Sequence, residues 1–318
     1  MADSIPPNAL IGDRYALRGV IGEGAMGVVH EAADPEGRPV AVKVLVRTDA
    51  EGLARFRREI EVCARIEHPN VVPVLDHGVD EAIGVPYFVM PLLRGGDLSV
   101  HMKRTGAMPV EVTAPLVVQA CRGVAAAHQA GVIHRDIKPS NLILEETDGQ
   151  VTLLVADFGL ATAEGLGGKL TRSGALLGTP HYISPEQSTD PKAVDARADV
   201  WSLGMVLFQM LAGAPAFANA GVFMSFLVQK KGVPPLQDVA PWIDGRIARV
   251  VHAALIRAID ARWPDVGELL LGLEMAVGFD VARRKLSLGD IVGVGEATRG
   301  LVAPRAEIPQ HWDELLRG

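Results

Sequence analysis

Cysteine is scarce in this chain, and neither of its two cysteines lies in a disulfide or metal-binding pattern. Cys63 and Cys121 both fall within apolar stretches that have helical spacing. Two thiols placed in this way exclude a disulfide framework and a thiolate metal site, and they suit a reducing compartment. We therefore expect a cytoplasmic protein.

Basic charge and aromatic residues are also in short supply. Lysine and arginine number 31 against 38 aspartate and glutamate residues, which gives a formal net charge of −7. Sequence-independent binding to nucleic acid or anionic lipid needs a positive net charge. We therefore expect no nucleic acid as a partner. Aromatic residues make up only 5% of the chain, but the hydrophobic total of 48% is typical of a soluble globular protein.

Uninterrupted apolar runs and a basic, apolar N-terminal signal are absent. The first residues, MADS, lack both a basic region and an apolar region, so the sequence predicts no secretory signal. The longest apolar stretch covers residues 200–217, but serine, glutamine, glycine and proline interrupt it. We interpret it as a buried core helix that ends near Gly213 rather than as a membrane span, and we expect no membrane segment in this chain.

The first part of the chain has a mostly strand-like pattern. Alternating or short apolar runs predict strands over residues 15–21, 28–33, 39–46, 71–77 and 85–90. One charged, amphipathic helix interrupts them over residues 50–66. It stops before Pro69, because proline disfavours the helical conformation in the residue ahead of it.

Beyond Pro91 the pattern becomes helical. Apolar stripes and stop signals predict helices over residues 110–128, 200–211, 247–259 and 266–277. The sequence therefore predicts an α+β protein with two lobes. We expect an extension at 1–14, a small β-rich N-lobe at 15–90, a hinge at 91–96, a helical C-lobe at 97–277, and a polar tail or linker at 278–318 outside the compact domain.

The strongest indication of function is the string HRDIKPSN, followed by DFG. Chemistry on the terminal phosphate of a nucleotide needs a carboxylate, a cation and metal ligands in one place. Asp136 is the candidate base for the incoming hydroxyl, and Lys138 can reach the transferring phosphate. Asn141 and Asp157 offer the oxygen ligands that Mg²⁺ prefers. We therefore predict a site for Mg²⁺ and a nucleotide.

A second nucleotide signal is the glycine run GEGAMGV, with Gly22, Gly24 and Gly27. Alone it is weak, because dinucleotide-binding folds use the same spacing. In those folds the run opens a helix, whereas the residues after Gly27 have a strand-like pattern. A glycine hairpin between two strands can lie over a triphosphate and offer it backbone N–H groups. An ordinary hairpin turn remains the alternative.

Lys43 stands in an otherwise apolar strand, AVKVL. A lysine in a strand usually faces solvent, but here Glu59 on the following helix offers a carboxylate partner. A lysine held in this way can be fixed against the α- and β-phosphates. We predict the Lys43–Glu59 ion pair, although Glu59 could equally be a solvated charge of the helix.

Together these motifs resemble those of the eukaryotic-type (Hanks-type) protein kinases, and the chain is most similar to the bacterial Ser/Thr protein kinases. The resemblance covers residues 15–277. It implies the two-lobed kinase fold, with ATP and Mg²⁺ as cofactors and Ser/Thr hydroxyls of proteins as acceptors of the γ-phosphate. It also implies that Asp199 anchors the catalytic loop and that Glu186 pairs with Arg262. The residues expected to stack as a regulatory spine are His134, Phe158, Cys63 and a strand residue near Val74.

The resemblance assigns the nucleotide contacts residue by residue. Val28 and Ala41 are expected to sandwich the adenine, and Met90 resembles the gatekeeper. Pro91 replaces a common glutamate, but only its carbonyl is needed there, and the N–H of Leu93 is expected to meet the adenine ring. The full expected set is Ile21, Gly22, Gly24, Gly27, Val28, Val29, Ala41, Lys43, Met90, Pro91, Leu93 and Ile143.

The segment from Asp157 to Glu186 is long for a loop, and such loops are usually functional. By resemblance, Thr171 and Ser173 fall where related bacterial kinases autophosphorylate, and Arg135 is placed to receive the phosphate. Plain surface hydroxyls are the alternative. Thr179 matches a position that helps to select Ser/Thr acceptors. Autophosphorylation between molecules would involve a transient homodimer.

Two rival functions stay open. A pseudokinase scaffold would bind nucleotide without transferring phosphate. Its usual mark is loss of the lysine, the base or a metal ligand, yet Lys43, Asp136, Asn141 and Asp157 are all present. A small-molecule kinase of the same fold is disfavoured by the IKP run after Asp136 and by the stretch over residues 178–186.

Overall fold

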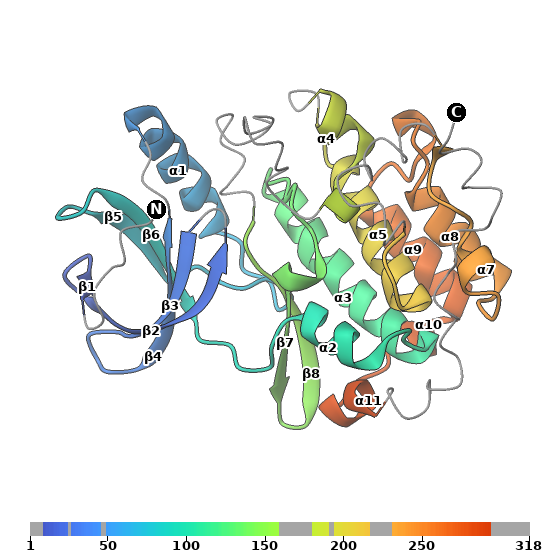
Figure 1. Cartoon of the computed structure of the whole chain (residues 1–318), viewed down its shortest axis with the longest axis horizontal. Coiled ribbons are helices and arrows are strands. Elements are labelled where there is room, and N and C mark those ends of the chain that lie inside the picture. Colours follow the sequence, from blue (N-terminus) through green and yellow to red (C-terminus); the bar gives the residue numbers. More distant parts are fainter. Residues whose placement is uncertain are drawn as a thin grey trace, which may run out of the picture.

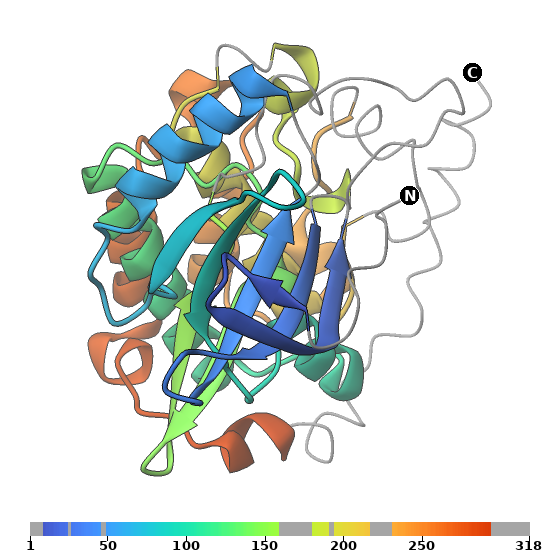
Figure 2. The same ribbon diagram turned by 90° about the vertical axis from the view of Figure 1, so that its left-hand side faces the viewer.

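The computed structural model shows two lobes joined by a short connector (Figure 1). It describes residues 9–24, 27–45, 49–158, 180–190, 194–216 and 231–293. The N-lobe consists of β1 (Leu10–Ile11), β2 (Tyr15–Gly24), β3 (Gly27–Ala33), β4 (Pro39–Leu45), α1 (Ala50–Cys63), β5 (Asp76–Asp80) and β6 (Val85–Pro91). Its strands form one six-stranded antiparallel sheet in the order β1-β2-β3-β4-β6-β5. Seen from the N-lobe, this sheet lies in front of the C-lobe helices (Figure 2).

The two faces of the sheet carry separate cores, because successive side chains of a strand point to opposite faces. On one face the valines of β4 pack with Tyr87 and Val89. On the other face α1 packs Phe56 and Ile60 against Phe88. The second face is the one that carries Lys43. The lysine therefore lies on the side of the sheet covered by α1 and not on the β1 side.

The C-lobe is built around two buried helices. Its elements are α2 (Leu98–Thr105), α3 (Val110–Gln129), η1 (Pro139–Asn141), β7 (Leu142–Thr147), β8 (Gln150–Val155), η2 (Pro180–Tyr182), α4 (Pro185–Thr189), α5 (Arg197–Ala212), α7 (Leu236–Val239), α8 (Gly245–Ala254), η5 (Ile259–Ala261), α9 (Val266–Val277), α10 (Phe279–Ala282) and α11 (Leu288–Val292). Helices α3 and α5 supply much of the core. The predicted end of the apolar helix near Gly213 is confirmed, since α5 is capped there by a glycine with φ of 77°.

One helix of the described chain, α3, is long and apolar enough to cross a membrane, with a mean hydropathy of 1.2. Its most apolar window is 67% buried inside the C-lobe. A core helix of this length passes the same test, so the finding carries little weight. Residues 200–212, from the longest apolar run of the sequence, form most of the core helix α5.

Several element boundaries differ from the sequence predictions. The helix predicted over residues 247–259 is α8, which begins at Gly245 and ends at Ala254. The strand predicted over residues 71–77 begins only at Asp76. Its apolar start pairs with the C-lobe instead: Val71 forms a parallel bridge to Val155, and the N–H of Val72 donates to the Val155 carbonyl at 3.0 Å. Helix α1 ends at Cys63 rather than at residue 66. The predictions also missed α2 and the β7–β8 hairpin.

The described part of the tail packs against the C-lobe, which differs from the expectation that it lies outside the compact domain. Leu286 is 1% exposed and Ile291 is fully buried. The N–H of Val151 on β8 donates to the Leu286 carbonyl at 2.7 Å. A few apolar residues are enough to pack this part of the tail against the C-lobe. Because they are sparse within a polar, glycine-rich stretch, the sequence pattern did not predict the packing. Residues 294–318 lie outside the described part.

Candidate active site

The predicted base, cation and amide meet in the loop between α3 and β7. The Nζ atom of Lys138 lies 2.7 Å from Oδ2 of Asp136. The side-chain N–H₂ of Asn141 donates to the Asp136 carbonyl at 2.7 Å and to its Oδ2 at 3.2 Å. Since the nitrogen of Asn141 is directed to Asp136, the amide oxygen of Asn141 is the atom left to bind a cation.

The loop is held from below by a buried carboxylate of α5. Asp199 is fully buried, and its two oxygens accept the backbone N–H groups of His134 and Arg135, both at 2.8 Å. The ring Nε2 of His128 lies 2.8 Å from the same carboxylate. Arg135 has φ of 63°, a conformation that needs such support. His128 was not predicted as part of the site, because no spacing signal in the sequence marks it.

A second set of contacts connects the loop to the segment around residues 184–187. The side-chain N–H₂ of Gln187 donates to the Arg135 carbonyl at 2.7 Å. The expected ion pair between Glu186 and Arg262 is present, with two contacts of 2.7 and 3.0 Å. Burial acts to raise the pKa of Glu186, but the hydrogen bonds and charge of Arg262 outweigh it and lower that pKa.

The predicted Lys43–Glu59 pair is absent from the described structure, and this prediction is corrected here. Lys43 is 8% exposed, and its Nζ lies 2.7 Å from Oδ2 of Asp157. Glu59 is half-buried on α1, where burial raises its pKa and the charges of Arg55 and Arg135 only partly offset that effect. In this arrangement the ammonium group of Lys43 is paired with Asp157 and not with Glu59.

The strand register corrects one of the expected adenine contacts. Residues directly opposite each other in antiparallel strands share a face of the sheet. Val29 lies opposite Lys43, whereas Val28 lies opposite Val44, whose side chain belongs to the other core. Val29 therefore shares the face of Lys43 and Ala41, and Val28 points away from it. The glycine spacing alone could not show which of the two valines shares the face of Lys43. A shift of one residue in the strand register moves a side chain to the opposite face of the sheet.

The glycines at the tip of β2 and β3 differ in what surrounds them. A Cβ atom added to Gly24 would meet no atom within 4 Å, and one added to Gly22 would meet only Val29, at 3.9 Å. The space on the side-chain side of these two glycines is thus open. A Cβ on Gly27 would lie 2.1 Å from the Val44 carbonyl, so Gly27 is needed for the strands to pack. Ile21, beside them, is 51% exposed.

Other expected nucleotide contacts surround the same cleft. Met90 lies opposite Ala41 in the sheet, and Pro91 ends β6 at the start of the connector. Leu93 lies in that connector, and Ile143 on β7 forms a bridge with Asp97 at the connector's far end. The structure thus brings the expected adenine contacts of the connector close to Ile143 of the C-lobe.

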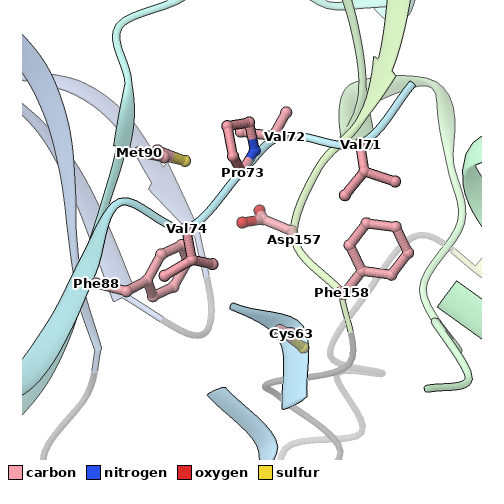
Figure 3. A pocket seen from close by; sticks show the side chains of 9 residues that line it. All are labelled: Cys63, Val71, Val72, Pro73, Val74, Phe88, Met90, Asp157 and Phe158. Carbon is pink, nitrogen blue, oxygen red and sulfur yellow. The ribbon is translucent and has the colours of Figure 1, made fainter. Parts of the chain in front are cut away.

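A cavity lies where the end of α1, strand β6 and the segment after β8 meet, and Met90 is among the residues that line it (Figure 3). Three of the four expected spine positions, Cys63, Val74 and Phe158, line it together with Asp157. The ring of Phe158 lies 4.8 Å from that of His134, centroid to centroid. Burial raises the pKa of the Cys63 thiol to about 11, so it stays protonated and packs as an apolar side chain.

The described residues fit a nucleotide with a bound divalent cation. Asn141 and Asp157 are oxygen donors, which suit a hard cation, and Lys43 and Lys138 add positive charge for phosphates. The absence of side chains at Gly22 and Gly24 leaves space beside this turn. The expected activation-loop residues Thr171, Ser173 and Thr179 lie outside the described residues.

The structure brings the predicted base, a lysine and the two predicted metal ligands to the junction of the two lobes, an arrangement that phosphoryl transfer requires. A family model of the protein kinase domain matches residues 15–237, which is more than half of the chain. The chain belongs to the protein kinase family.

Similar proteins are bacterial serine/threonine-protein kinases. The chain is 38% identical to the serine/threonine-protein kinase PknB of Mycobacterium leprae, with 83% of this chain and 43% of that protein covered. It is 35% identical to the probable serine/threonine-protein kinase CE0033 of Corynebacterium efficiens, over 84% of this chain and 42% of that one. The chain thus spans about two fifths of the length of these relatives.

The fold also matches a solved kinase structure. The crystal structure of the PknI kinase domain of Mycobacterium tuberculosis aligns with a TM-score of 0.68 and 28% sequence identity. The alignment covers 86% of this chain and all of that one. The two-lobed kinase fold predicted from the motifs is therefore confirmed.

Proposed function

We propose that the chain transfers the γ-phosphate of Mg·ATP to serine and threonine hydroxyls of proteins. The observation that carries the proposal is the convergence of Lys138 and Asn141 on the carboxylate of Asp136. Asp136 orients an acceptor hydroxyl and accepts its proton, and Lys138 offsets negative charge beside it. When bound, Mg²⁺ supplies neutralisation of the charge on the phosphate oxygens. Asn141 and Asp157 are the residues that would hold it.

The test is transfer of labelled phosphate from ATP by the purified chain, with Mg²⁺, to itself and to a basic protein acceptor. Hydrolysis of the labelled product should yield phosphoserine and phosphothreonine without phosphotyrosine. Replacing Mg²⁺ with an excess of chelator should abolish the label. Label confined to tyrosine, or transfer that is insensitive to the chelator, would contradict the proposal.

A nucleotide-binding scaffold is the second candidate, and the ion pair between Lys43 and Asp157 is the observation that favours it. In this arrangement the lysine and a metal ligand neutralise each other. The same transfer assay separates the two functions, because a scaffold binds ATP but leaves every acceptor unlabelled.

Autophosphorylation of Thr171 and Ser173 is part of the proposal, with Arg135 as the residue that receives the phosphate. The support is that Arg135 directly precedes Asp136, in the loop that Asp199 anchors. Mass spectrometry after incubation with ATP tests it, and finding both residues unmodified would reject it. A rate of labelling that rises with the square of protein concentration would support the transient homodimer.

A cytoplasmic location also belongs to the proposal. Both cysteines are free and buried in the structure, as suits a protein in a reducing compartment. Fractionation of cells that express the natural protein would test it.

A further inference from the structure

A carboxylate that no motif marks clamps the connector between the lobes. Oε2 of Glu145, on β7, accepts the backbone N–H of Arg94 at 3.0 Å and that of Gly95 at 3.2 Å. These two amides follow directly after Leu93, whose N–H is expected to meet the adenine ring. One side chain therefore fixes the backbone next to a predicted nucleotide contact.

The backbone of the connector lies directly against β7 at this point. A Cβ atom on Gly95 would be 1.7 Å from the Leu144 carbonyl oxygen, so no side chain fits between the two segments. The N–H of Leu144 donates to the Gly96 carbonyl at 2.9 Å. The ring Nε2 of His101, on α2, lies 2.9 Å from the Gly95 carbonyl. The connector is thus held by contacts with both β7 and α2.

Glu145 shares a face of β7 with Ile143, because side chains two residues apart in a strand point the same way. Ile143 is one of the expected nucleotide contacts, and it pairs with Asp97 at the end of the connector. The neighbouring Glu146 has a different partner: its Oε1 accepts the N–H of Leu288, in the tail, at 3.2 Å. Two adjacent carboxylates therefore hold two different segments.

We propose that Glu145 is a positioning residue for nucleotide binding. By holding the amides of Arg94 and Gly95, it sets the distance between the connector and Ile143, and so the height of the slot that receives the base. This inference rests on the proposed function, since it assumes that an adenine nucleotide binds between these two segments.

Three substitutions separate the geometry of the carboxylate from its charge. Glu145→Ala removes the acceptor, and Glu145→Asp keeps the charge but withdraws the oxygens by one methylene. Glu145→Gln keeps an acceptor oxygen in place without the charge. We expect the KM for ATP to rise about tenfold in the first two, with less than about a threefold change in kcat, and to stay within about threefold of wild type in the third. Glu146→Ala is the matched control, with wild-type KM expected.

Backbone amide exchange in the nucleotide-free protein gives a readout that needs no transfer. The amides of Arg94 and Gly95 should exchange faster in Glu145→Ala and in Glu145→Asp than in Glu145→Gln or wild type. If Glu145→Ala does not fold, the comparison of Glu145→Asp with Glu145→Gln decides the matter. An equal KM in these two variants, with equal amide exchange, would overturn the inference and leave the proposed function intact. A wild-type chain that binds no adenine nucleotide would overturn both.

Discussion

Lys43 and Asp157 join the two lobes across the cleft, with Nζ and Oδ2 2.7 Å apart. The lysine belongs to β4 of the N-lobe, and the aspartate follows β8 of the C-lobe. The sequence had predicted that Lys43 pairs with Glu59 on α1. Because Asp157 takes the ammonium group in this arrangement, Glu59 stays half-buried without that partner.

Replacing Glu59 by Gln should stabilise the chain near neutral pH. Burial raises the pKa of Glu59 above its ordinary value of 4.5. The stability linked to the protonated carboxyl is present below that ordinary value and is lost as pH rises through the raised one. The ionised side chain therefore costs stability at about pH 7, and Glu59→Gln should have the higher Tm there.

The difference should shrink towards zero below about pH 4, where the carboxyl is protonated in both states. The matched control is Glu61→Gln, since Glu61 is exposed on the same helix and should leave the Tm unchanged. A lower Tm for Glu59→Gln at neutral pH would show that Glu59 has a stabilising partner in solution.

Replacing Asp136 by Asn should remove transfer while nucleotide affinity stays close to that of the wild type. The amide cannot accept a proton from the acceptor, and a positioned general base contributes about 10²–10⁴-fold. Single-turnover transfer and nucleotide titration measure the two effects. Asp148→Asn, in the exposed turn between β7 and β8, is the control. More than about a tenth of wild-type transfer would remove Asp136 from this role.

Replacing Glu186 by Ala should destabilise the fold strongly. The side chain of Arg262 is fully buried, and loss of its carboxylate partner leaves a buried charge. Such a loss costs about 3–5 kcal/mol, which urea unfolding can measure. Asp260→Ala is the control, because Asp260 pairs with Arg197 but is 93% exposed, and it should cost less than about 1 kcal/mol.

The effect of Glu186→Ala should also depend on pH. The pKa of Glu186 is lowered in the folded chain, so its contribution is present above the ordinary value of 4.5 and is lost as pH falls through the lowered value. The gap in stability between wild type and variant should therefore narrow in acid. A constant gap would mean that the carboxylate is not the stabilising form.

Two glycines of the nucleotide loop should respond differently to alanine. Gly27→Ala places a methyl group 2.1 Å from the Val44 carbonyl, which the backbone must relieve. We expect a loss of about 1–3 kcal/mol in unfolding free energy. Gly24→Ala meets no atom within 4 Å and should change that free energy by less than about 0.5 kcal/mol. Equal effects of the two changes would contradict the observed strand pairing.

The local sequence pattern was enough to predict those sites and elements whose residues lie close together in the sequence. Asp136, Lys138 and Asn141 lie in one short loop, so their spacing already predicted that they converge. The helix predicted over residues 110–128 was confirmed as α3, because its apolar periodicity reflects burial against a single core. In both cases one continuous stretch of sequence contains all the residues on which the prediction depends.

The sequence alone determined the kinase fold, the two lobes and the catalytic loop, since these follow from periodicity and from motifs whose parts lie close together. Tertiary structure decided which carboxylate holds Lys43, whether Val28 or Val29 faces the cleft, and that Glu145 clamps the connector. Each of these choices depends on strand register or on the approach of distant segments. A one-residue shift of register reverses the faces of a strand, and the choice between two carboxylates depends on how the lobes pack.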